Sequence, residues 1–407
     1  MTATLTPPRS AALRLETFTS FDDAEAIAPQ WDALVARLSG SLYMTFSWCQ
    51  VWWRHYGAGR ELRLIMIHAD EELVGVLPFF IDRLWLPAGR TRAAKLIGSD
   101  SVIAVVDAPV VLEVAEEAFA LAVSQLFLDD RADMVHVGPL PGEAAGVAAI
   151  RRSCSGMAGI AQIIRDREAG SHTLFELPEG FDAYLRGLSK NHRSNYRRNL
   201  NKLDKTFRFE VDVVRDADAL ECEFEAFVEM HQAQWQAVNK LGHFDDWPGS
   251  REFSRDLVRT LAQTDHVRLV RLLADDRVVA YYWCFAMNGV YYWRLPARVT
   301  GQEWDRFALG RVGLIKMMQV AATEGATAIE AGSGRYEYKE QLNAKSLPLR
   351  SITLCRRGLG PRLRVLLTLA YGELLNLIYY RLWYIRLAPR MGALRGPLRR
   401  GWIRRRF

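Results

Sequence analysis

The sequence predicts a mixed α/β protein, with an α+β mixed sheet, that is built as two similar halves followed by a basic tail. In each half, strand-like hydrophobic runs precede an amphipathic helix and a further apolar strand. Composition agrees, because 407 residues that are 50% hydrophobic and 25% charged suffice for two cores. We expect domains at residues 1–165 and 166–355 and a tail at 356–407.

The first half combines helical and alternating hydrophobic patterns. An aromatic-rich run from Phe46 to Tyr56 has helical spacing, and an acidic turn at 70–72 joins two strands. The expected elements are a helix at 31–38, strands at 62–67 and 73–80, a helix at 115–128 and a strand at 134–137.

The second half repeats this plan at greater length. It opens with one long helix over 181–203 that carries a Leu and Tyr stripe. A three-stranded meander follows, and its turn at Asn288-Gly289 is a strong hairpin signal. The other expected elements are a strand at 207–213, helices at 224–238 and 253–262, strands at 267–273, 278–285 and 290–295, a helix at 307–323 and a strand at 327–330.

Several short segments in a fixed order carry a resemblance to a known family. They are the aromatic run Trp48–Trp53, Leu73–Pro78, the basic helix Lys190–Arg198, His231–Trp235, Val279-Ala280, Tyr291-Tyr292, the helix opened by Gly310, and Gly332–Lys339. Over Trp31 to Leu354 the chain resembles the CelD-like (cellulose-biosynthesis-type) acetyltransferases of the GNAT superfamily. Glu330 stands where that family commonly has Asp, and Gly313 replaces a large apolar residue.

This resemblance implies tandem duplicated GNAT-like folds and transfer of an acyl group from acyl-CoA to an amine. The acyl group is expected to be acetyl, and the acceptor a small metabolite, an amino sugar or an envelope or polysaccharide precursor. The chain also resembles the Fem aminoacyltransferases, which use aminoacyl-tRNA, but it has no heptad run for their coiled-coil arm. A catalytically silent accessory module of a membrane polysaccharide synthase is the remaining alternative.

Acyl transfer from CoA requires a cradle for a pyrophosphate. The unpaired N–H groups of a helix N-terminus bind anions, and the turn Leu309-Gly310-Arg311 offers them together with a cationic side chain. These three residues are predicted to bind the donor, and the alternative is an ordinary helix start. Arg193 and Arg197, on the basic helix, are predicted to bind an anionic substrate group, which could belong to the CoA 3′-phosphate, a tRNA end, an acidic saccharide or a lipid headgroup, and the alternative is a solvated helix face. Nucleic acid is not expected as a partner of the whole protein, because its excess positive charge lies in the tail.

Candidate catalytic groups are His231 and Tyr338. A neutral imidazole at 231 could act as a general base, although a buried core histidine is an equally plain interpretation. Four further residues are predicted to contact the acceptor. The alternative for the lysine among them is an ordinary surface position, and the alternative for the strand residues is that alternate ones face the core. These residues are Trp235, Tyr292, Arg294 and Lys339.

Several signatures are missing from the sequence. We find no Walker A loop, no His-Glu-x-x-His segment, no nucleophile elbow and no metal-spaced His or Cys cluster, so no metal is predicted. The five cysteines are scattered and odd in number, which favours a reducing compartment. A secretory h-region is also missing near the N-terminus, so a cytoplasmic location is expected.

The tail has an unusual charge. Residues 356–407 contain 13 Arg, no Lys and one acid, a net charge of +12, whereas the rest of the chain carries −6. Its apolar stretch at 365–387 is too often interrupted by charges to predict a transmembrane span. An anionic inner membrane surface is therefore a candidate partner for residues 362–407, and the alternative is a helix packed on its own domain with a disordered end.

Overall fold

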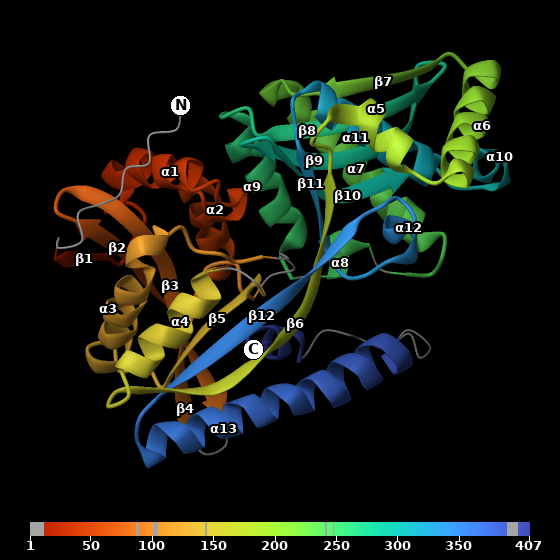
Figure 1. The fold of residues 1–407 in the computed structure, drawn as a ribbon. Coiled ribbons are helices and arrows are strands. Elements are labelled where there is room, and N and C mark those ends of the chain that lie inside the picture. The colour runs from red at the N-terminus through yellow and green to blue at the C-terminus, as the bar shows by residue number, and fades with distance from the viewer. Residues whose placement is uncertain are drawn as a thin grey trace. The chain divides into compact units, whose positions relative to one another are not determined.

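The computed structural model describes residues 12–86, 89–100, 105–142, 145–240, 242–246, 248–388 and 398–407. The chain divides into two compact units (Figure 1). We call Ser171–Leu347 the central unit, and Met1–Gly170 together with Pro348–Phe407 the terminal unit. In the described residues no helix is long and apolar enough to cross a bilayer.

The central unit is a mixed sheet with helices on it. Four strands form an antiparallel meander, and β11 (Ala328–Ser333) then pairs parallel to the last of them. The final residues of β6 (Ala161–Glu176) lie antiparallel to β11. The meander is β7 (Phe209–Val214), β8 (Val267–Ala274), β9 (Arg277–Met287) and β10 (Val290–Arg298).

Two groups of helices cover this sheet. The helices α7 (Ala217–Gln236) and α9 (Ser250–Ala262) pack against each other and on β8, while α11 (Leu309–Thr323) packs on β9 and β10 together with α5 and α6. The remaining helices are α5 (Gly180–Gly187), α6 (Lys190–Thr206), α8 (His243–Asp246), α10 (Gln302–Asp305) and α12 (Glu337–Glu340).

The terminal unit has the same strand plan. Its four antiparallel strands are followed by β5 (Met134–Pro141), which runs parallel to β4, and by β12 (Lys345–Arg356), antiparallel to β5. The four are β1 (Leu13–Phe18), β2 (Glu61–Ala69), β3 (Glu72–Leu86) and β4 (Gly89–Leu96). Its helices include α1 (Ala28–Arg37), α2 (Phe46–Tyr56), α3 (Ala115–Leu128), α4 (Ala145–Gly156), α13 (Leu359–Leu374), the π-helical segment η4 (Leu375–Leu387) and α15 (Arg399–Ile403).

Each unit therefore has four antiparallel strands, a fifth parallel strand and an antiparallel sixth. This repetition confirms the predicted fold class of duplicated GNAT-like units. The sixth strands are exchanged between the two units. In chain order β6 follows the first five strands of the terminal unit, yet it is the sixth strand of the central unit, and β12 follows β11, yet it is the sixth strand of the terminal unit. The compact units therefore differ from the expected ranges. Residues 348–355, which were expected in the second domain, and 356–407, which were expected to form a separate tail, both belong to the terminal unit, where Leu349–Cys355 pair with β5.

Some local predictions were wrong. The long helix expected at 181–203 breaks at Leu188, because Ser189 caps a new helix by accepting a hydrogen bond from the His192 N–H at 3.3 Å. Strands β1, β4, β6 and β12 and helix α4 were not predicted. The helix at 115–128 was predicted with the bounds that α3 has.

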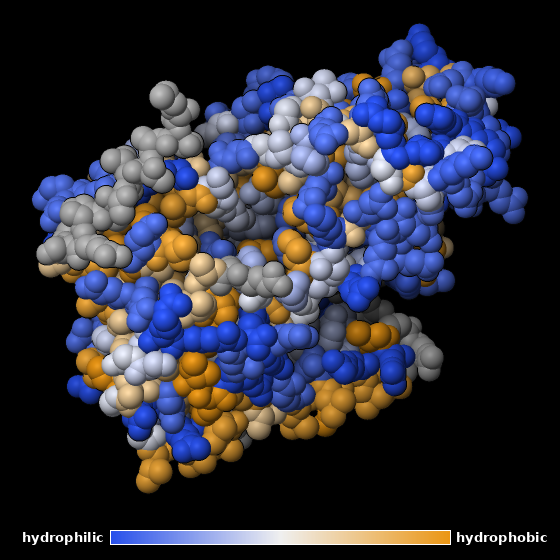
Figure 2. Space-filling view, in the orientation of Figure 1, coloured by the Kyte–Doolittle hydropathy of each residue, from blue (hydrophilic) through white to orange (hydrophobic). Residues whose placement is uncertain are grey.

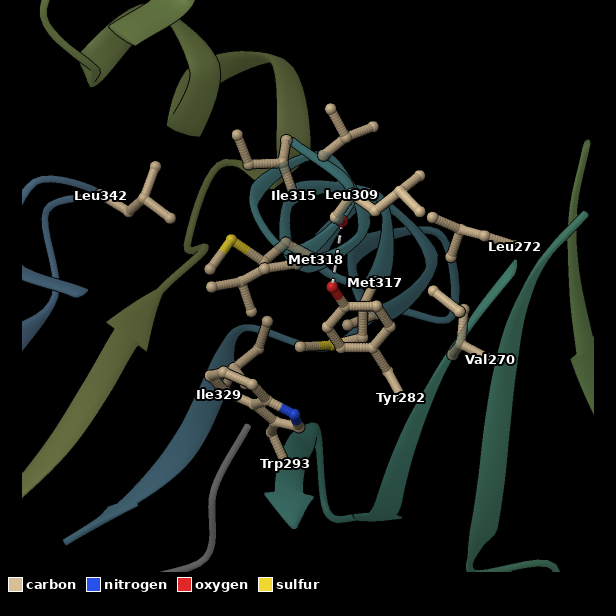
Figure 3. Packing of buried hydrophobic residues seen from close by; sticks show 14 of the residues in the cluster. Val270, Leu272, Tyr282, Trp293, Leu309, Ile315, Met317, Met318, Ile329 and Leu342 are labelled. Atoms are coloured by element: carbon tan, nitrogen blue, oxygen red, sulfur yellow. Dashed lines mark hydrogen bonds between the residues drawn. The ribbon is translucent and has the colours of Figure 1, made fainter. Parts of the chain in front are cut away.

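The core of the central unit lies between α11 and the sheet (Figure 3). Tyr282 of β9 points from the sheet toward the start of α11. Ile315, Met317 and Met318 of the same helix belong to the same core cluster. An added Cβ on Gly313 would lie 2.5 Å from the Tyr282 ring, so the glycine makes room for the tyrosine. Gly313, where the resembled family has a large apolar residue, is thus explained by the tyrosine that fills that space.

Candidate functional site

A β-bulge marks one place in the central sheet. The pairing of β10 with β9 shifts between Trp293 and Leu295, so Arg294 is the extra residue. The parallel pairing of β10 with β11 runs only from Val290 to Tyr292 and ends where the bulge begins. Bulges that end a ladder next to a helix start are frequent beside binding sites, because they re-aim side chains and free backbone groups.

A cavity of about 300 Å³ lies where β10 leaves this ladder and α11 begins. Trp293, Leu314 and Leu342 give it apolar walls, and the first turn of α11 closes one end. Its full lining is Gln234, Tyr282, Trp293, Pro296, Ala297, Arg298, Gly310, Arg311, Leu314, Tyr338 and Leu342.

The closed end of this cavity is electropositive. The first turn of α11 contains no acid. The Arg311 and Val312 N–H groups donate to the Ala308 carbonyl at 2.9 and 3.1 Å, so within the described residues the Leu309 and Gly310 N–H groups are the ones left for a ligand. Arg311 lies in that turn and donates to Gln341 Oε1 at 2.7 Å. Arg298 approaches from the end of β10, since an added Cβ on Gly310 would lie 3.5 Å from its Nε. The predicted donor residues Gly310 and Arg311 therefore line a cavity that suits an anionic group.

Tyr282 fixes the geometry of this turn. Its hydroxyl donates to the Gly310 carbonyl at 2.9 Å and lies 3.4 Å from the Leu309 carbonyl (Figure 3). Leu309 itself is 1% exposed, so its side chain belongs to the core while its backbone shapes the turn. Burial raises the pKa of Tyr282 far above its usual value, so this hydroxyl remains a donor.

Tyr338 is the predicted catalytic residue that does reach the cavity. It follows Tyr336, whose ring centroid lies 5.9 Å from its own, and it remains 42% exposed. Burial is the main cause that raises the pKa of Tyr338 to about 12. The phenol therefore stays protonated at neutral pH and can donate a proton.

Lys339 lies behind the cavity wall rather than in it. It is 4% exposed, and its Nζ donates to the Ala331 carbonyl at 2.6 Å. The ammonium also lies 5.7 Å from the centroid of the Trp293 ring. Burial lowers its pKa to about 8. Neither a surface lysine nor a substrate contact describes it, because the side chain ties α12 to the end of β11.

The geometry argues against His231 as a general base. Its Nδ1 lies 2.8 Å from the Pro296 carbonyl, and its Nε2 lies 3.1 Å from His243 Nδ1 and accepts from the His243 N–H. This pattern assigns a neutral imidazole with both nitrogens engaged. Burial lowers its pKa to about 4 and the ring does not line the cavity. Trp235 packs against His243, with ring centroids 5.1 Å apart, and does not line the cavity either.

The other predicted substrate contacts are dispersed. Tyr292 is buried in β10, and Arg294, in the bulge, lies against the Trp283 ring. Arg193 and Arg197 lie on α6 along a separate, solvent-open groove of that helix. The polar lining residues Gln234, Tyr282 and Arg298 were missed by sequence reasoning. The Arg298 N–H donates to Gln234 Oε1 at 3.0 Å. Nothing local distinguishes them from ordinary helix and strand residues.

Comparisons with known proteins find one family model that matches part of the central unit. Residues 190–340 match the Acetyltransferase (GNAT) domain. The fold is similar to that of the crystal structure of FemX, with a TM-score of 0.56 and 11% identity over 83% of this chain and 96% of that one. No curated protein is detectably similar in sequence.

Two further solved structures are similar at a lower level. L-PGS from Bacillus licheniformis has a TM-score of 0.48 and 12% identity, covering 83% of this chain and 95% of that one. A tandem GNAT protein from the clavulanic acid biosynthesis pathway has a TM-score of 0.41 and 12% identity, covering 85% of this chain and 99% of that one.

Proposed function

We propose that the protein is an N-acyltransferase that transfers an acyl group from acyl-CoA to an amine, with its donor site in the central unit. One observation carries this proposal: the bulged end of β10 and the acid-free first turn of α11 form the two sides of one partly apolar cavity. A CoA thioester has the matching chemistry, because a pyrophosphate is anionic and the acyl and pantetheine chains are uncharged. The match of residues 190–340 to the Acetyltransferase (GNAT) domain supports this proposal.

The donor would be held at the two ends of the cavity. The pyrophosphate would accept from the leading N–H groups of α11, and Arg298 and Arg311 would add charge beside it. The thioester would extend along Trp293 and Leu314 toward Tyr338. Fixing the thioester in this way supplies part of the rate, because positioning replaces an encounter in solution.

The chemical step needs one proton donor from this chain. The neutral amine attacks the thioester carbonyl carbon, a C–N bond forms, and the C–S bond breaks with its electron pair on sulfur. We assign Tyr338 as the general acid that gives its proton to that thiolate, since its pKa of about 12 keeps it protonated. The proton that the attacking amine loses passes to water and restores the phenol.

The acceptor is expected to be a small amine or an amino sugar. A tRNA-linked donor is the second candidate, and the basic face of α6 is the observation that favours it. None of its six cations has an ion pair with any residue that the structure describes, and the helix buries only Tyr196 and Leu203. These cations are Lys190, Arg193, Arg197, Arg198, Lys202 and Lys205.

Thermal-shift titration of the full chain tests the donor assignment. Acetyl-CoA, longer acyl-CoAs and free CoA should each raise the melting temperature, and a Gly310→Glu variant should lose the shift because a carboxylate repels pyrophosphate. The matched control is Gly360→Glu, which also alters a glycine at the second position of a helix, α13. Stabilisation by aminoacyl-tRNA and by no CoA species would overturn the proposal in favour of the second candidate.

A further inference from the structure

The C-terminal helix exposes an unusual amount of apolar surface. More than half of the exposed large hydrophobic residues in the described part of the chain lie on α13 and η4. Figure 2 shows hydrophobic residues gathered along the lower edge of the view, where Figure 1 places α13. We call this set the apolar face: Leu359, Leu363, Leu366, Leu367, Leu374, Leu377, Ile378, Leu382 and Ile385.

The opposite side of the same helix is anchored to its own unit. Val365, Thr368 and Leu369 are buried, and Thr368 Oγ1 lies 2.7 Å from Thr91 Oγ1 of β4. In η4 the buried residues Leu375, Tyr379 and Tyr384 continue this line at the wider π-helical spacing. The apolar face is therefore held outward by the fold, and an exposed face of neighbouring large apolar residues is typical of an interaction surface.

The charges around this face are almost all positive. Exposed Arg362, Arg381 and Arg386 lie on the same two segments, within a region of 13 Arg and one acid. Beside the helix, a cavity of about 350 Å³ is lined by further arginines, including Arg165 and Arg167. Both of these donate to Glu373 at 2.9 Å, so Arg381 of the same lining has no ion pair with any residue that the structure describes.

From this arrangement we infer that α13 and η4 lie on an anionic phospholipid bilayer, with the apolar face among the acyl chains and the flanking arginines on headgroup phosphates. Apolar contact alone would also fit a second copy of this chain. The charge of this surface favours the bilayer. Two copies of the chain would bring two positively charged surfaces together, whereas an anionic bilayer attracts a positively charged surface. An amphipathic helix with cationic flanks and an apolar face binds in this manner.

This inference goes beyond the acyl-transfer proposal and is tested without any acyl donor. The full chain is mixed with phosphatidylcholine vesicles that contain or lack phosphatidylglycerol, and the bound fraction is measured by flotation. We expect binding that requires phosphatidylglycerol. Changing Arg362, Arg381 and Arg386 to Gln should weaken it on the order of 100-fold, because each basic residue contributes roughly fivefold, or about 1 kcal/mol.

The apolar contribution has its own variant and control. Leu374→Glu with Leu377→Glu should abolish flotation, whereas Leu112→Glu with Leu128→Glu, at residues that are comparably exposed, should leave it unchanged. Circular dichroism verifies that each variant is folded. Failure to bind phosphatidylglycerol vesicles overturns the inference. So does a concentration-dependent dimer that Leu377→Glu dissociates, because the second copy would then be the occupant.

Discussion

The two units share one strand order, yet they differ at the place where the fifth strand leaves the fourth. In the central unit, α11 has no acid in its first turn and β10 carries a bulge. In the terminal unit, the corresponding helix α3 begins with Glu116 and Glu117, and β4 pairs with β3 without a register shift from Phe79–Leu96 to Leu86–Gly89. Acids at a helix N-terminus neutralise the dipole that would bind an anion.

The terminal unit also holds a buried ion cluster where its fourth and fifth strands pair. Lys95 of β4 is opposite His136 of β5 in their parallel ladder, the same place that Tyr292 and Glu330 hold between β10 and β11. The Lys95 side chain is fully buried. Its ammonium donates to Asp100 at 2.7 Å and to the Arg404 carbonyl at 2.6 Å. The terminal unit thus uses this part of its sheet for internal packing, whereas in the central unit we propose that the donor binds where the fourth and fifth strands separate.

The largest expected effect lies in this ion cluster. Asp82 is fully buried and bonds Arg404 and Arg60, so Asp82→Asn leaves buried cations without their counter-charge. We expect the free energy of unfolding to fall by about 3–5 kcal/mol. Urea denaturation followed by tryptophan fluorescence measures this loss.

The control is Asp276→Asn, which removes one partner of an exposed ion pair with Arg208 in the central unit. It should cost less than about 1 kcal/mol. Equal losses in the two variants would show that the cluster does not hold the terminal unit together.

A smaller effect is expected on catalysis in the central unit. Tyr338→Phe removes the proton that the leaving thiolate requires, so kcat should fall about 100-fold while KM for acyl-CoA stays the same. Tyr336→Phe, which alters the neighbouring exposed phenol, should retain activity. Because the pKa of Tyr338 is about 12, this residue should add no alkaline limb to the rate profile below about pH 11. Comparable losses in both variants would refute the assignment.

The smallest effect concerns acid stability, to which one buried histidine of lowered pKa in each unit contributes. Burial lowers the pKa of His231 to about 4 and that of His136 to about 3, from an ordinary value of 6.5. As the pH falls below 6.5, the unfolded chain binds the proton first, so stability decreases toward the folded pKa. Each histidine should cost on the order of 2 kcal/mol between about pH 7.5 and pH 5.

The variant His231→Gln tests this assignment, because it should flatten the pH dependence of the central unit alone. Hydrogen exchange measured at both pH values resolves the two units. An unchanged slope for the central unit would show that His231 is not the titrating group.

Local signals predicted much of the fold but only part of the candidate site. The Asn288-Gly289 turn and helix α3 were predicted because hairpin and helix patterns are local. Strand β4 was missed because a lysine such as Lys95 is typical of a surface position. In the fold this lysine is buried, and its ammonium is paired with the carboxylate of Asp100. At the site, Gly310, Arg311 and Tyr338 line the cavity. His231 does not line it, and its Nδ1 is hydrogen-bonded to the carbonyl of Pro296, a contact 65 residues away that no local sequence signal shows.

We propose that the chain binds acyl-CoA once, in the central unit. Isothermal titration of the full chain with acetyl-CoA measures this directly. We predict one site per chain, retained in Gly360→Glu and weakened at least about 100-fold in Gly310→Glu, while circular dichroism stays unchanged, since Gly310 has room for a side chain beside Arg298. Two sites per chain, or affinity that Gly310→Glu leaves unchanged, would contradict the account.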